Sequence, residues 1–229
     1  VAQYLPIFNT EVNLHESGYR ILQAAPMKLF FNLGNITSTY QPGHSHADAF
    51  SFCLYQNGAP IIVDRGVSTY NISDERDVQK ATNAHNTICI NNENSTDVWA
   101  SFRVGDRAKV LLETDKQNEL SARLTTIGKA QHKRQIKALS AAFEIIDELN
   151  SWKVHKAVLY LHFYPNVKIL KGEKYWTLPN FGIQILLDDF ENSFEEEYDY
   201  CVGFNKVLKA KRIVCCMSSS NHTSIIKYE

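Results

Sequence analysis

Short runs of β-branched and aromatic residues, separated by turn-forming residues, recur along almost the whole chain. Apolar residues seldom follow the three- and four-residue spacing of an amphipathic helix. Gly, Pro, Asn, Asp and Ser bound most of the runs, which is typical of short β-strands. The pattern predicts fourteen strands, at 19–24, 27–33, 49–55, 60–64, 86–90, 107–114, 119–127, 134–139, 142–149, 156–164, 167–170, 175–178, 181–187 and 211–217.

This density of strands predicts an all-β fold, a multi-strand antiparallel β-sandwich. A doubly wound parallel sheet is excluded because no strand–helix–strand rhythm appears. The chain has 229 residues, enough for one large domain, and it begins with Val1 rather than methionine. We therefore expect one β-sandwich domain over residues 1–229, as a fragment of a larger protein.

Two local signals refine this prediction. Within 49–55, alternate residues from Phe50 to Leu54 share one face, which we expect to lie in the core. The pair Asn57-Gly58 that follows predicts a two-residue hairpin. In contrast, the polar stretch 68–84 has little periodicity and predicts a loop or a single short helix. Long ordered loops in compact domains are usually functional.

Composition removes several function classes. The 24 Lys and Arg residues are balanced by 25 Asp and Glu residues, so no basic field suggests nucleic acid. No apolar run reaches the roughly 18–20 residues that a membrane span needs. Five cysteines without a C-x-x-C pair argue against a zinc ribbon and against a disulfide framework.

Two histidines stand two residues apart in "QPGHSHADAFSF", which covers residues 41–52. Residues so spaced in an extended chain point to the same side, so His44 and His46 could present two imidazoles to one cleft. Asp48 follows after the same interval, and imidazole with carboxylate suits zinc. Taken alone, these residues leave open both a metal site and a role without metal.

One motif with this spacing is H-x-H-x-D-H of the metallo-β-lactamase-like hydrolases. The match breaks at Ala49, where the last histidine should stand. A predicted strand and hairpin also follow here, where that motif opens onto a glycine pair and a helix. This interpretation is therefore disfavoured.

A longer stretch carries a different resemblance. "GHSHADAFSFCLYQNGAPIIVDRG" and "TNAHNTICINNENSTDVWASFRVGDRAKV" resemble the C-terminal β-sheet domain of the heparinase II/III-like polysaccharide lyases. The similarity extends to "HESGYRIL" and "LFFNLG" upstream and to "RQIKALSAAFEIIDEL" and "LHFYPNVKIL" downstream, and it fades after about residue 190. It implies a parent enzyme that cleaves acidic, uronic-acid-containing polysaccharide by β-elimination. The catalytic base and acid of that family lie on an N-terminal (α/α) toroid that this chain lacks.

The resemblance also implies a structural metal, zinc, with His46, Asp64 and His85 as ligands. A strict two-residue turn at Asn57-Gly58 conflicts with this ligand set, because Asp64 would then pair with Ser51 rather than with His46. Five residues of strand separate those two positions, about 16 Å. A bulge or a bent strand must intervene, and Asp48 remains the alternative ligand.

Three further residues are implied at the substrate. His44 matches the histidine that faces the substrate at the domain junction and is the predicted catalytic residue of this chain. Tyr70 and Arg76, in the 68–84 stretch, are the predicted substrate-binding residues, since arginine pairs well with a carboxylate or sulfate. The family usually has a Trp-Arg pair in this loop where this chain has Glu75-Arg76, which weakens the match at these two contacts.

The expected partners are therefore an acidic polysaccharide and the toroid domain of the same protein, with no nucleic acid and no membrane span. The fragment alone is expected to be inactive. The alternative function is a non-catalytic glycan-binding or scaffolding module of a surface-polysaccharide protein. We expect the parent protein in the periplasm or cell envelope of a bacterium, with the cytoplasm as the alternative location.

Overall fold

The computed structural model describes residues 14–36, 40–150, 154–217 and 220–229. Its strands are β1 (Tyr19–Ala24), β2 (Met27–Asn32), β3 (Phe52–Gln56), β4 (Ala59–Ile62), β5 (Ile88–Ile90), β6 (Val98–Trp99), β7 (Arg103–Val104), β8 (Lys109–Lys116), β9 (Glu119–Thr125), β10 (Gln131–Ala138), β11 (Ala142–Leu149), β12 (Ala157–His162), β13 (Leu170–Lys171), β14 (Tyr175–Leu178), β15 (Ile183–Asp188), β16 (Phe190–Gly203), β17 (Lys206–Met217) and β18 (Asn221–Tyr228). Its helices are the 3-10 turns η1 (His15–Ser17) and η2 (Thr82–Ala84) and the α-helix α1 (Asp74–Lys80).

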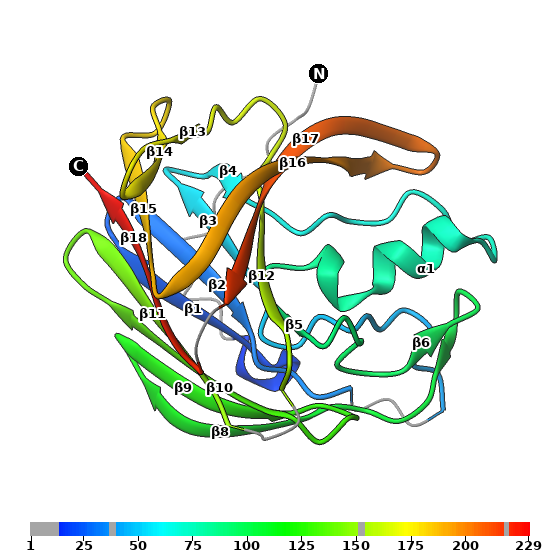
Figure 1. Cartoon of the computed structure of the whole chain (residues 1–229). Helices are drawn as coiled ribbons and strands as arrows, with labels where there is room; N and C mark the ends of the chain where they lie inside the picture. Colours follow the sequence, from blue (N-terminus) through cyan, green and yellow to red (C-terminus); the bar gives the residue numbers. More distant parts are fainter. Residues whose placement is uncertain (1–13, 37–39, 151–153, 218–219) are drawn as a thin grey trace.

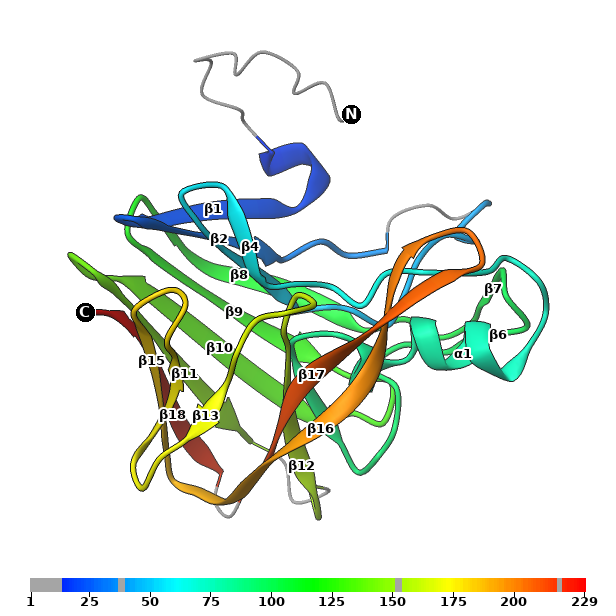
Figure 2. The same ribbon diagram turned by 90° about the horizontal axis from the view of Figure 1, so that it is seen from above.

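The strands form antiparallel sheets, which confirms the predicted all-β class. The largest sheet has eight strands in the order β13-β14-β15-β18-β11-β10-β9-β8. Two four-stranded sheets have the orders β1-β2-β3-β4 and β16-β17-β12-β5, and β6 and β7 pair separately. Figure 1 shows the eight-stranded sheet curving around one side of the molecule, and Figures 1 and 2 both place α1 with β6 and β7 at the opposite end.

One hydrophobic core joins the sheets. Leu29 and Phe31 of β2 pack in the same buried cluster as Ile136 of β10, Phe143 of β11 and Leu161 of β12. Alternate residues from Phe50 to Leu54 are at most 2% exposed, so the face predicted to lie in the core is confirmed. Apolar faces of several sheets are thus buried against one another, as a sandwich requires.

The 68–84 stretch, predicted as a loop or a single short helix, contains one short α-helix, α1, followed by the 3-10 turn η2. Ser73 caps the N-terminus of α1 by accepting a hydrogen bond from the backbone N–H of Arg76 at 3.2 Å. The η2 turn follows and leads to His85 in extended conformation. This segment therefore delivers Arg76 and His85 to the same region of the molecule.

Several sequence predictions need correction. Strands β6, β7, β16 and β18 were not predicted, and the predicted strand 167–170 forms only at its last residue. β16 was missed because the run of exposed acidic residues from Glu195 to Glu197 interrupts any apolar alternation on both faces of the strand. The predicted strand 49–55 begins only at Phe52, because the chain turns before it.

Candidate functional site

An open cleft of about 480 Å³ lies beside the "GHSHAD" segment. Its lining includes His44, His46, Asp48 and Asp64, together with Asn32 of β2. Four of the residues singled out from the sequence therefore line one cavity. Tyr70, Arg76 and His85 are not among the residues that line it.

A turn explains how His46 and Asp64 reach the same cleft. The backbone N–H of Ser51 donates to the carbonyl of Asp48 at 2.9 Å, and Phe50 between them has a φ of 67°. A register shift between Leu54 and Tyr55 adds a bulge to the hairpin below. Residues 46–51 are thus not an extended strand, and the separation of about 16 Å expected for one does not apply.

His85 and Asp64 form the tightest contact at the site. Nδ1 of His85 lies 2.6 Å from Oδ2 of Asp64, and Oδ1 of Asp64 accepts the backbone N–H of Gly66 at 2.9 Å. Burial opposes a charged imidazole, but the carboxylate of Asp64 outweighs it and raises the pKa of His85. Burial likewise opposes a charged Asp64, and His85 outweighs it, so the pKa of Asp64 is lowered. Asp64 and His85 therefore each stabilise the charged form of the other.

His46 lies next to this pair and is held neutral. Its ring centroid is 5.3 Å from that of His85. Burial, followed by the nearby His85, lowers the pKa of His46 to about 3. Nη1 of Arg76 lies 3.5 Å from Nε2 of His46, an arrangement that favours a ring nitrogen with a free lone pair. A neutral imidazole is the form that binds metals.

The residues implied as zinc ligands fit a metal in their chemistry. His46 is neutral, and Nε2 of His85 is buried without a hydrogen-bond partner. However, Asp64 already engages His85, and the described residues contain no group of three His, Cys, Asp or Glu side chains arranged to hold a metal ion. Zinc at this site stays a prediction. A carboxylate bound to the far nitrogen of a histidine is a common support for a metal-binding ring.

Asp48, the alternative ligand, has a different set of contacts. Its Oδ2 accepts a hydrogen bond from Nδ2 of Asn32 at 3.0 Å. Its desolvated position raises the pKa of its carboxyl group. Asp48 thus faces the cleft but is held by β2 rather than by the two histidines.

His44 is exposed at the cleft and is packed against aromatic rings. Tyr70 and Phe102 meet it edge-on, with centroid distances of 5.6 and 6.0 Å. The two rings stack on each other with an interplanar angle of 8°. Sequence reasoning missed Phe102. Only the folded structure brings Phe102 beside Gly43, where a Cβ would lie 3.2 Å from Cδ1 of Phe102.

Arg76 lies behind His46 and not at the surface. Its side chain is completely buried, its guanidinium lies 5.3 Å from the centre of the Tyr70 ring, and Nε and Nη2 have no hydrogen-bond partner. In this conformation Arg76 contacts His46 and Tyr70 rather than the cleft. Its predicted contact with substrate therefore stays a prediction.

Fold and site together define an all-β sandwich domain with an open cleft lined by histidine and carboxylate side chains. Among the described residues, no helix is both long enough and apolar enough to cross a membrane. The family model "Heparinase II/III-like, C-terminal" matches residues 10–229. The chain belongs to this family.

Solved structures show the same fold. A heparinase III structure is 15% identical, with a TM-score of 0.72, and the match covers 98% of this chain and 36% of that one. A mutant of the heparan sulfate lyase HepC from Pedobacter heparinus is 18% identical, with a TM-score of 0.68, over 88% of this chain and 33% of that one. The chain thus spans about a third of these structures. A comparison with curated proteins finds no match.

A more distant structure has the same architecture. It is a chondroitin AC lyase from Streptomyces coelicolor A3 in complex with chondroitin sulphate, with 9% identity and a TM-score of 0.54. The match covers 90% of this chain and 31% of that one.

Proposed function

We propose that the chain is the β-domain of a polysaccharide lyase that cleaves uronic-acid-containing polysaccharide by β-elimination. The observation that carries this proposal is the cleft of about 480 Å³ that His44, His46 and Asp64 line, in a chain of the heparinase II/III-like family. Three structural neighbours are a heparinase III, a heparan sulfate lyase and a chondroitin AC lyase. All three names denote enzymes of acidic polysaccharides, which supports this substrate class.

In the proposed reaction a base removes the proton α to the uronate carboxylate. The electrons of that C–H bond form the C=C bond, and the 4-linked sugar leaves with its oxygen protonated by an acid. The difficult requirement is to stabilise negative charge on the carboxylate while base and acid act. We assign base and acid to a second domain, because this chain supplies only one wall of the site.

Within this wall His44 is the residue that would contact the reacting sugar. It is exposed, and the edges of Tyr70 and Phe102 limit the positions that its ring can take. Tyr70 is 45% exposed and adjacent, so it can contact a neighbouring sugar. Arg76 contributes positive charge from behind His46, which favours an anionic substrate in the cleft.

We further propose that His46, Asp64 and His85 hold a structural zinc ion. When bound, such an ion would cross-link the turn at His46 to the segment that carries His85. Support comes from the neutral His46 and from the buried, unpartnered Nε2 of His85. These residues would fix the wall of the cleft, and with it the position of His44.

The test compares the isolated chain with the full-length protein that contains it. Each is incubated with heparin, heparan sulfate and alginate, and absorbance of the unsaturated product is followed. We expect product from the full-length protein and none from the isolated chain. Robust turnover by the isolated chain would contradict the proposal that a second domain supplies the base and the acid. Glycan binding without product from either protein would instead favour the non-catalytic glycan-binding module.

A further inference from the structure

Asn86 is completely buried and connects several segments that are distant in sequence. Its backbone N–H donates to Oγ of Ser51 at 3.0 Å, and its Nδ2 donates to the carbonyls of Phe52 and Val63 at 2.8 and 2.9 Å. Its Oδ1 accepts the backbone N–H of His162 at 2.7 Å. One amide side chain therefore joins β3, the end of β4 and β12.

These contacts fall immediately beside the candidate site. Val63 precedes Asp64 in the chain, and Asn86 follows His85. The bond from Asn86 to the carbonyl of Val63 thus ties together the two backbones that carry the Asp64–His85 pair. Those two side chains meet at 2.6 Å. Neither Asn86 nor Val63 lines the cleft.

Arg134 of β10 reaches the same place from the eight-stranded sheet. Its Nη1 donates to the carbonyl of Phe50 at 2.7 Å and to that of Asn86 at 3.3 Å. Phe50 is the residue with positive φ in the turn between Asp48 and Ser51. Non-glycine residues rarely adopt this conformation unless the surroundings hold it. Arg134 therefore connects the turn to the segment that follows His85.

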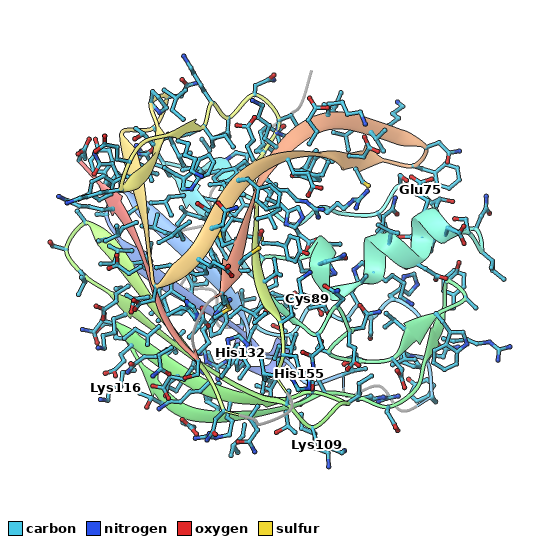
Figure 3. The ribbon with its side chains drawn as sticks, viewed as in Figure 1. Glu75, Cys89, Lys109, Lys116, His132 and His155 are labelled. Atoms are coloured by element: carbon cyan, nitrogen blue, oxygen red, sulfur yellow. The ribbon has the colours of Figure 1, made fainter. Side chains whose placement is uncertain are left out.

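Asp147 holds Arg134 in place. Its two carboxylate oxygens accept Nε and Nη2 of Arg134 at 2.7 and 2.9 Å, and Nε2 of His132 lies 2.6 Å from Oδ1. All three side chains are at most 1% exposed, and Figure 3 labels His132 within the body of the molecule. Because a buried ion pair contributes little net stability, its distinctive effect here is to aim Nη1 of Arg134 at two carbonyl oxygens.

We propose that Asn86 and Arg134 are positioning residues of the candidate site. They hold Asp64, His85 and the turn after His46 in one arrangement without contacting a ligand. This inference rests on the proposed function only in that it takes these side chains as the site. The arrangement of Asp64, His85 and the turn after His46, which it explains, is present in this chain whatever the chain's function.

The experiment records the imidazole signals of His85 by long-range ¹H–¹⁵N NMR at one fixed pH. The first variant is Asn86→Leu, and its matched control is Gln56→Met. Gln56 is also a buried amide, and it donates to the carbonyl of Phe181 at 3.1 Å, on contacts separate from the site. Both variants replace an amide by an apolar side chain of similar size. Melting temperatures are measured for each protein.

We expect Asn86→Leu to shift the His85 signals from their parent positions and Gln56→Met to leave them in place, with both variants folded at the temperature of the measurement. Unchanged His85 signals in Asn86→Leu, or an equal shift in Gln56→Met, would overturn the proposal. If Asn86→Leu does not fold, the double variant Arg134→Met with Asp147→Leu decides by the same criterion. It removes both charges together and so leaves no unpaired buried ion.

A second readout separates this inference from the proposed function. If the parent chain takes up Zn²⁺, the positioning variants should weaken its affinity about 10- to 100-fold, the usual effect of losing a supporting residue. If the parent takes up none, the proposed metal site fails. The NMR comparison still decides whether Asn86 and Arg134 position His85.

Discussion

His46 and His44 are close in sequence but have different surroundings. His46 contacts Arg76 and lies 5.3 Å from the ring of His85, whereas His44 is exposed between Tyr70 and Phe102. The proposed zinc ion would bind His46, while His44 would remain available to the substrate.

Replacing each histidine by alanine should therefore have different effects. We expect His46→Ala to lose bound zinc and to melt at a lower temperature, because it removes a ligand that cross-links two segments. His44→Ala should keep both the metal and the melting temperature of the parent. Elemental analysis and thermal unfolding measure the two effects. Equal melting temperatures for His46→Ala and the parent would count against the metal site.

His162 makes a prediction about acid stability. It is completely buried, with Nδ1 3.2 Å from Oδ1 of Asn86 and Nε2 3.4 Å from Nη1 of Arg212. Burial, and then the charge of Arg212, lower the pKa of His162 well below its ordinary value of 6.5. Below pH 6.5 the unfolded chain therefore binds a proton at this residue that the folded chain does not. Stability must fall as the pH decreases from there.

The expected contribution of His162 is about 1.4 kcal/mol of unfolding free energy per pH unit. Urea unfolding of the parent and of His162→Gln between pH 7.5 and 4.5 measures it. The variant should lose stability less steeply toward acid, whatever its stability at pH 7.5. Parallel pH profiles for the two proteins would show that His162 is not held neutral by the fold.

At the scale of single residues, the sequence gives a partial account of the site. The H-x-H spacing and the family resemblance pointed to His44, His46, Asp64 and His85, and the structure places these side chains in one region. The turn at Phe50 could not be predicted, because a positive φ at phenylalanine is enforced by tertiary contacts. The roles of Asn86 and Arg134 were also missed, since they depend on carbonyls far away in sequence.

At the scale of elements, the hairpin of β16 and β17 shows why the strand pattern was incomplete. Lys211 pairs with Glu195 at 2.6 Å and Lys209 with Asp199 at 2.7 Å across the two strands. Charged residues that pair across a ladder leave no apolar alternation to detect. In the part of β17 that packs on the core, Ile213 is completely buried.

The hairpin should therefore be stabilised by its buried residues and not by its ion pairs. Lys211→Ala is expected to change the free energy of unfolding by less than about 1 kcal/mol, because both partners are exposed to water and screened. Ile213→Ala should cost about 2–5 kcal/mol through lost burial and a cavity. Chemical denaturation compares them. A loss in Lys211→Ala as large as that in Ile213→Ala would contradict this account.

At the scale of the whole molecule, the sandwich fold was predictable from the sequence. The division of the active site between this chain and a second domain is a proposal. Alternating runs and turn residues indicated an antiparallel all-β class, which the sheets confirm. The chain spans about a third of the solved structures that it matches. We therefore propose that His44 acts on a sugar held between this chain and a second domain.

The most direct test is the rate of β-elimination by the full-length protein and by its His44→Ala variant. The control is His155→Ala, since His155 is exposed and does not line the cleft. Loss of one positioned group that stabilises developing charge typically lowers the rate by about 10²- to 10³-fold. We expect a loss of this size in kcat for His44→Ala, with bound zinc and melting temperature unchanged and His155→Ala fully active. Parent-like turnover by His44→Ala would contradict it.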